Sequence, residues 1–212
     1  MNENNKPVFA SDYTDLDDLL SQFPEPLRNH SRRVAVCSVI ITEYGDKFLF
    51  PFGMTNMDFE VAVHLGGTCH DIGKILIPYM DDSEKENHLH PVFGAEALDY
   101  NRERFFKNNK QADIVLDMVR YHHEWPNGKG YPKKLKTADI PLLAAVCAIA
   151  DELDHLAYNE KGGVCNDFEK VYAAIKKQSG KKFIDFVFGY FSQAWPRLIG
   201  KYTEWNKKSP DS

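Results

Sequence analysis

The residues from Gln111 to Glu124 carry the clearest periodic pattern in the chain. Two series recur at every fourth position, one residue apart: Ile114, Met118 and His122, and Val115, Val119 and His123. Because residues four apart share one side of an α-helix, the segment predicts an amphipathic helix whose apolar face includes both histidines. We expect this helix to end at Pro126, before a loop that contains Gly128 and Gly130.

Apolar positions at helical spacing predict further helices along the chain. They cover a short helix near 14–23, longer helices at about 27–44, 56–71 and 140–156, a helix beginning at Pro91, and two closing helices around 168–175 and 183–190. No segment has a convincing strand pattern, and no internal repeat is present. A chain of 212 residues suits one well-buried domain. We therefore predict an all-α, single-domain helical bundle of about seven to nine helices.

Within this bundle we expect a short N-terminal extension with one helix at residues 1–23, the main domain at 24–195 and a C-terminal tail at 196–212. The formal net charge of −5 argues against binding to DNA or RNA, because phosphate neutralisation needs a basic face. The four cysteines are widely spaced, which predicts buried, reduced thiols and a cytoplasmic protein. No stretch reaches the ~20 apolar residues of a membrane span, so no membrane association is expected.

Seven polar side chains fall where the helical patterns require apolar ones: His30, His70, Asp71, His90, His122, His123 and Asp151. A single such residue would be interpreted as a hydrogen-bonded core histidine or as half of an ion pair. Seven in one small domain point to metal, because burying each polar group without a partner costs several kcal/mol. Seven nitrogen and oxygen ligands are too many for one tetrahedral zinc and suit two ions of higher coordination, which the two oxygens of Asp71 can bridge. Iron or manganese is expected, with zinc, nickel and magnesium as alternatives.

Taken in order, these residues resemble a known family. The set comprises His30, His70-Asp71-x-Gly73-Lys74, His90-Pro91-x-x-Gly94, His122-His123 and Ala150-Asp151-x-x-Asp154, and it is similar to the HD-superfamily metal-dependent phosphohydrolases. The run from His122 to Pro132 looks like the HHE…DG.GYP signature of the HD-GYP branch, with Asn127 where Asp is usual. The resemblance covers roughly residues 25–195 and implies that the predicted bundle is an HD-type domain.

The resemblance implies a bacterial phosphodiesterase that hydrolyses a cyclic dinucleotide, typically cyclic di-GMP. It places one metal on His30, His70, Asp71 and Asp151, and the other on Asp71, His90, His122 and His123. Two cations would acidify a bridging water to hydroxide and neutralise the phosphodiester, which allows attack on phosphorus. Asp71 and Lys74 are therefore the expected catalytic residues.

The residues expected to contact the substrate are Lys74, Tyr131 and Lys161. Lys74 would hold a non-bridging phosphate oxygen, although its position also suits an exposed lysine at a helix end. Tyr131 would stack on or hydrogen-bond to the substrate, or would simply pack the loop. Asp154, one turn after Asp151, is expected to orient a histidine ligand.

The stretch after Asp154 departs from the family pattern. Members that cut cyclic di-GMP continue into an Arg-Pro-Tyr-Arg-like stretch that binds phosphate, whereas this chain has Glu160 about where an Arg would stand and Lys161 as a replacement. Pro26 occupies the place of a Glu that supports a third metal in some members, so two metals are expected.

Two alternatives to a phosphodiesterase therefore stay open. One is a catalytically weak or inactive metal-bound module that senses a nucleotide or binds a partner. The other is an HD hydrolase of another nucleotide phosphoester. The expected partner is a cyclic dinucleotide or a related nucleotide, and a homodimer is an open alternative to a monomer.

Overall fold

The computed structural model describes residues 13–45, 53–76, 88–158, 165 and 167–207. Within these ranges the chain forms α-helices, one short 3₁₀-helix and loops, with isolated β-bridges and no strand. The prediction of an all-α, single-domain bundle is therefore confirmed. No helix in this described part of the chain is both long enough and apolar enough to cross a bilayer.

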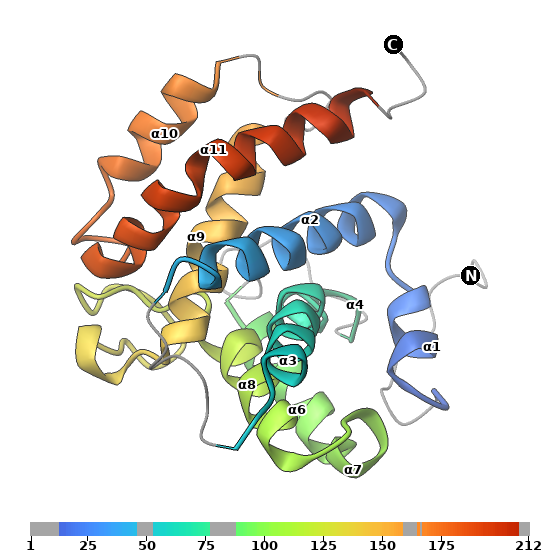
Figure 1. Cartoon of the computed structure of the whole chain (residues 1–212). Coiled ribbons are helices and arrows are strands. Elements are labelled where there is room, and N and C mark those ends of the chain that lie inside the picture. The colour runs from blue at the N-terminus through green and yellow to red at the C-terminus, as the bar shows by residue number, and fades with distance from the viewer. Residues whose placement is uncertain (1–12, 46–52, 77–87, 159–164, 166, 208–212) are drawn as a thin grey trace, which may run out of the picture.

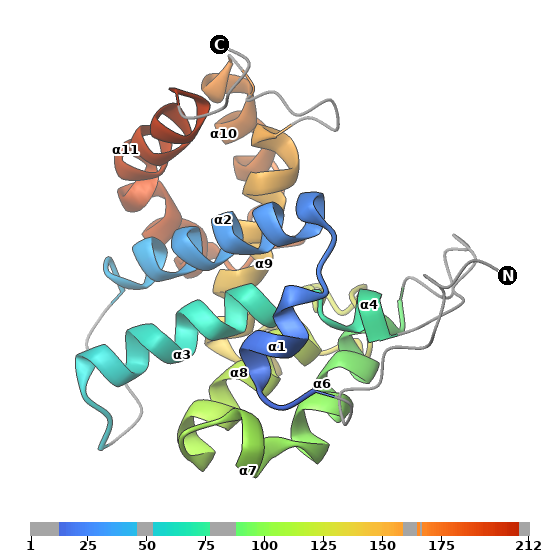
Figure 2. The same ribbon diagram turned by 90° about the vertical axis from the view of Figure 1, so that its right-hand side faces the viewer.

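The elements, in chain order, are α1 (Leu16–Ser21), α2 (Glu25–Thr42), α3 (Asn56–Cys69), α4 (Gly73–Leu76), α6 (His90–Tyr100), α7 (Arg102–Phe105), α8 (Asn109–Tyr121), η3 (Thr137–Asp139), α9 (Leu142–Ala157), α10 (Phe168–Lys176) and α11 (Asp185–Lys207). Helices α2, α3, α8 and α9 form the centre, where α2 and α8 each pack against both α3 and α9. Helices α10 and α11 cover α9 at one end of the molecule, and α6 and α7 lie at the other end (Figure 1). Helix α1 packs against the side formed by α3 and α6 (Figure 2).

Helix α8 has the predicted apolar face and joins two apolar clusters, but it ends at Tyr121 and not at Pro126 as predicted. Its first turn is capped by Asn108, whose side chain accepts a hydrogen bond from the backbone N–H of Gln111. One series of buried residues, with Met118, faces a large cluster shared with α2, α3, α9, α10 and α11. The other series, with Val119, faces a smaller cluster shared with α1, α3 and α6. The two series end at His122 and His123, just after the last residue of the helix. Both rings therefore extend the buried faces of α8 with polar side chains.

Glycines bring α3 unusually close to its neighbours. A Cβ on Gly67 would lie 2.5 Å from Ala35 Cα in α2. A Cβ on Gly66 would lie 2.3 Å from Met118 Sδ in α8. At Gly67 the atoms in the way are backbone, so only glycine allows α3 to pack this close to α2, whereas at Gly66 the nearest atom belongs to the flexible side chain of Met118. The close packing carries the end of α3 into the centre of the bundle.

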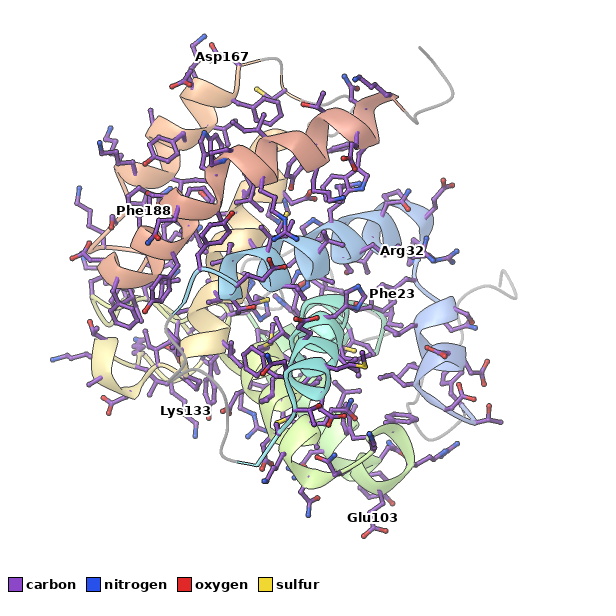
Figure 3. The ribbon with its side chains drawn as sticks, viewed as in Figure 1. Phe23, Arg32, Glu103, Lys133, Asp167 and Phe188 are labelled. Carbon is purple, nitrogen blue, oxygen red and sulfur yellow. The ribbon has the colours of Figure 1, made fainter. Side chains whose placement is uncertain are left out.

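Helix α11 continues through Pro196 to Lys207, so the described part of the segment assigned to a C-terminal tail is helical. A proline inside a helix removes one backbone hydrogen bond and crowds the preceding turn, which costs ~3 kcal/mol. Here Leu198 and Tyr202 beyond the proline are fully buried in the large cluster, and their burial offsets that cost. Earlier in the same helix, Phe188 packs against Tyr172 of α10 (Figure 3).

Candidate metal centre

The structure brings all seven predicted ligands together from five parts of the chain. They are His30 in α2, His70 and Asp71 at the end of α3, His90 at the start of α6, His122 and His123 at the end of α8, and Asp151 in α9. Six are buried and His123 is half-buried. Their ligand atoms fall into two groups, each with all atoms within 4.8 Å of one another: the His30 site (His30, His70 and Asp151) and the His90 site (Asp71, His90, His122 and His123).

Asp71 lies between the two sites and turns one carboxylate oxygen toward each. Its Oδ1 is 3.1 Å from Nε2 of His90, within the His90 site. Its Oδ2 is 3.4 Å from Nε2 of His70 and 3.8 Å from Nε2 of His30, within the His30 site. A carboxylate in this position can offer an oxygen to one cation in each site.

Two of the histidines are held by the helix that ends at them. His70 is the C-cap of α3, and its Nδ1 donates to the carbonyl oxygen of Gly67 at 2.8 Å. His122 is the C-cap of α8, and its Nδ1 donates to the carbonyl oxygen of Val119 at 2.9 Å. The last carbonyls of a helix have no intrahelical partner, so each ring satisfies one of them and turns its Nε2 toward the site.

The arrangement of the remaining nitrogens fits cations. Nε2 of His30 lies 3.3 Å from Nε2 of His70, and Nε2 of His90 lies 3.4 Å from Nε2 of His122. Two unprotonated nitrogens at such distances turn their lone pairs toward each other, which is unfavourable unless a proton or a metal ion lies between them. The buried Oδ1 of Asp151 also accepts no well-formed hydrogen bond. Imidazole nitrogens and carboxylate oxygens are suitable ligands for iron, manganese and zinc, so the donor set fits two divalent ions.

The two sites differ in how they bind protons. In the His30 site, burial alone would lower the pKa of His70, but the carboxylates of Asp71 and Asp151 outweigh it and raise that pKa to about 10. In the His90 site, burial lowers the pKa of His123 to about 3 and that of His122 well below its ordinary value. Without metal, the His30 site therefore holds a proton, whereas His122 and His123 stay neutral and offer free lone pairs.

Asp154 orients His30, as the sequence predicted. Its Oδ2 accepts a hydrogen bond from Nδ1 of His30 at 2.7 Å, and the guanidinium of Arg33 pairs with both of its oxygens. Burial raises the pKa of Asp154, but the hydrogen bonds from His30 and Arg33 outweigh it and lower that pKa. Asp154 is thus an ionised acceptor that keeps the proton of His30 on Nδ1 and directs Nε2 toward the site.

The residues predicted to contact substrate border the same centre. Nζ of Lys74 is 2.5 Å from Oδ2 of Asp71, and the lysine side chain is 38% exposed. The ring of Tyr131 lies 4.7 Å from that of His123 and stacks at 4.2 Å on the exposed His88. Lys161 lies outside the described residues.

The loop that carries Tyr131 is fixed by Glu124. This side chain is buried, and its two oxygens accept hydrogen bonds from the backbone N–H groups of Lys133 at 2.5 Å and Leu135 at 2.7 Å. Lys133 itself projects from the loop at the molecular edge (Figure 3). Because a charged acceptor binds both donors, the loop has a defined position beside the His90 site.

One residue near the centre was missed in the sequence. His155 places its Nε2 3.2 Å from Oδ1 of Asp151, and its ring lies 4.7 Å from that of His30. Its side chain is 59% exposed, so it lies at the rim of the His30 site. The signal that could have found it is its spacing of four residues from Asp151 on the same helix.

Comparison with known families agrees with this geometry. The model of the HD domain family matches residues 27–156, a span that includes all seven residues of the two sites. The match covers more than half of the chain. The chain therefore belongs to the HD domain family, and the recognition made from its sequence is confirmed.

Individual relatives add detail. The chain is 24% identical over 179 residues to 3′3′-cGAMP-specific phosphodiesterase 2 of Vibrio cholerae, covering 80% of this chain and 32% of the relative. It is 25% identical over 185 residues to a cyclic di-GMP phosphodiesterase of Thermotoga maritima, covering 82% of this chain and 46% of the relative. This chain therefore spans 32% and 46% of the length of these two relatives, less than half of each.

A solved structure shares the fold. Bd1817, an HDG"Y"P protein from Bdellovibrio bacteriovorus, superposes with a TM-score of 0.58 at 19% identity, covering 80% of this chain and 52% of the other. At this identity the similarity establishes a common fold.

Proposed function

We propose that this protein is a dinuclear-metal phosphodiesterase that hydrolyses a cyclic dinucleotide, with cyclic di-GMP as the first candidate. The observation that carries the proposal is the position of Asp71, which presents one oxygen to each of two imidazole-lined sites. Membership of the HD domain family and relatives named as phosphodiesterases support a metal-dependent phosphohydrolase. Iron or manganese suits the donor set best, with zinc, nickel and magnesium as alternatives.

When bound, two divalent ions supply an activated hydroxide and neutralise charge on the phosphodiester. The protein sets where this chemistry takes place. His70 and His122 are held through Nδ1 by their own helices, so their Nε2 atoms stay directed at the sites. Asp71 is fully buried between the sites and sets their separation. Burial of the ligands keeps bulk water from weakening these interactions.

The substrate side of the proposal involves Lys74, Tyr131 and Lys161. Lys74 pairs with Asp71 in this structure, and its partial exposure lets it turn toward a phosphate oxygen when a cation takes the carboxylate. Tyr131 presents its ring beside His123, where a base of the substrate can stack. We assign Lys161 to phosphate binding on its sequence position alone.

The first experiment measures metal content of protein purified without oxygen. Two ions of iron or manganese per chain are expected in the wild type and a loss of metal in Asp71→Ala. Asp113→Ala is the matched control, because Asp113 is an exposed acid that pairs with Arg102 away from the site. Substoichiometric metal that is unaffected by Asp71→Ala would refute the dinuclear site.

The second experiment tests turnover. Metal-loaded protein is incubated with cyclic di-GMP, with other cyclic dinucleotides and with a model phosphodiester, and the products are separated by chromatography. Hydrolysis that depends on Asp71 and Lys74 is expected. Loaded protein that hydrolyses none of these would contradict the proposal.

A second candidate function is a metal-bound module that binds a nucleotide without turnover. It is favoured by Glu160, which stands about where phosphate-binding members of the family carry Arg and would repel a phosphate. Tight binding of a cyclic dinucleotide to fully loaded protein, with no product formed under reducing conditions, would select it.

A further inference from the structure

The carboxylate of Asp154 is saturated by four hydrogen bonds from three side chains. Oδ2 accepts from Nδ1 of His30 at 2.7 Å and from Nη2 of Arg33 at 2.9 Å. Oδ1 accepts from Nε of Arg33 at 2.7 Å and from the hydroxyl of Tyr202, also at 2.7 Å. No lone pair is left for a metal ion, so Asp154 acts on the site only through the ring of His30.

The fourth donor comes from a distant part of the chain. Tyr202 lies on α11, two turns beyond Pro196, and its side chain is 0% exposed. Its ring packs against Trp205, and its oxygen receives a weak S–H hydrogen bond from Cys37 of α2. Because the hydroxyl oxygen accepts from Cys37, its own proton is free to be donated to Asp154. Close packing around the ring of Tyr202 holds it in a single orientation.

We propose that Tyr202 is a positioning residue of the His30 site, because its hydroxyl and Arg33 together fix the Asp154 carboxylate that holds the ring of His30. Without the hydroxyl, Oδ1 keeps a single hydrogen bond, from Nε of Arg33, and the carboxylate is held less firmly by Arg33 and His30 alone. The ring of His30 would then be held less firmly in its direction toward His70 and Asp151. The inference rests on the proposed two-metal function.

Two consequences follow. The functional unit extends past residue 195, because α11 contributes to the site after Pro196. The effect is also confined to one site, because Tyr202 reaches the centre through Asp154 and His30 and makes no such contact with the described residues of the His90 site. A general loss of packing would weaken both sites, whereas loss of positioning weakens only the His30 site.

The experiment measures metal affinity at each site separately. His123→Ala leaves the His30 site as the intact one, and His30→Ala leaves the His90 site as the intact one. Tyr202→Phe is introduced into each background, and binding of Mn²⁺ is measured by calorimetry and by electron paramagnetic resonance on oxygen-free protein. Tyr172→Phe is the matched control, because it also removes one partly buried hydroxyl hydrogen bond, to Ser192, from the α10–α11 pair.

We expect Tyr202→Phe to weaken Mn²⁺ binding about tenfold in the His123→Ala background, the lower end of the effect of residues that orient a metal-bound histidine. Affinity in the His30→Ala background, and affinity in both backgrounds with Tyr172→Phe, should match the parents. Unchanged affinity of the His30 site, or equal weakening of both sites, would overturn the inference. Absence of two Mn²⁺ ions from wild-type protein would instead refute the proposed function itself.

If Tyr202→Phe does not fold, 3-fluorotyrosine at position 202 replaces it. This side chain keeps the packing and makes the hydroxyl a stronger donor. A changed affinity of the His30 site alone supports the positioning role, and an unchanged affinity at both sites refutes it.

Discussion

Gly73 offers a sharp test of how closely the ligands depend on packing. It is the first residue of α4, and a Cβ placed on it would lie 2.0 Å from the carbonyl oxygen of His90 and 2.8 Å from His90 Cα. Ordinary contact begins at 3.4 Å, so Gly73→Ala must separate the two backbones by about 1.4 Å. Both contacts are with main chain, so no side-chain rotation can relieve them. The backbone that would be displaced is that of a proposed metal ligand.

A shift of this size has two measurable results. Sites that bind metal must be held within about 0.5 Å, so displacement of His90 should empty the His90 site or weaken it severely. Overpacking of this kind costs about 1–3 kcal/mol, which we expect as a fall in the free energy of unfolding. Metal content of oxygen-free protein and urea denaturation of the metal-free protein measure the two effects independently.

The control is Gly189→Ala in α11, where a Cβ would meet nothing within 4 Å. A helical glycine replaced by alanine in open space should be neutral or should stabilise by up to about 1 kcal/mol, with full metal content. If Gly73→Ala binds two ions and unfolds at the wild-type urea concentration, the close approach of α4 to α6 does not position His90, and the reasoning is refuted.

Three further predictions concern the loop held by Glu124, the proton on His70, and the reactivity of the cysteine thiols. Glu124→Gln should lower the free energy of unfolding, measured by urea denaturation, by about 1.5–3 kcal/mol, because the amide N–H₂ of Gln would face a backbone N–H. The control Glu96→Gln, at an exposed position, should leave urea denaturation unchanged. His70 has a folded pKa of about 10, above its ordinary 6.5, so it carries a proton at pH 8 that metal must displace. Calorimetry in two buffers with different heats of ionisation should detect proton release on Mn²⁺ binding, and the affinity for Mn²⁺ should rise with pH up to about 10. Binding without proton release would contradict this prediction. Burial raises the pKa of the Cys69 thiol to about 12, so at pH 8 a thiol reagent should modify half-buried Cys165 first and Cys69 only after unfolding.

The helices and the interior polar residues could be predicted because both are local properties. A period of four along α8 depends only on residues within that segment, and it placed His122 and His123 on the apolar face before any packing was known. The family signature added the order in which the ligands occur.

Local patterns do not determine where the last helix ends. Proline cannot complete the backbone hydrogen bond of a helix interior, so Pro196 by itself favours the end of a helix. The helix continues because Leu198 and Tyr202 have an apolar cluster to enter, and that cluster is built from helices far away in the sequence. Propensity is a local preference that burial elsewhere can outweigh.

What the sequence by itself determined is the class of fold, the set of inward-facing histidines and acids, and the family. The tertiary structure decided which of these groups meet: that Asp71 lies between two sites, that His155 reaches Asp151, and that Tyr202 reaches Asp154. The physical reason is that helical periodicity depends only on residues within one or two turns of each other, so it can be recognised in the sequence. The meeting of side chains 48 residues apart, as in the Tyr202–Asp154 hydrogen bond, depends on how whole helices pack.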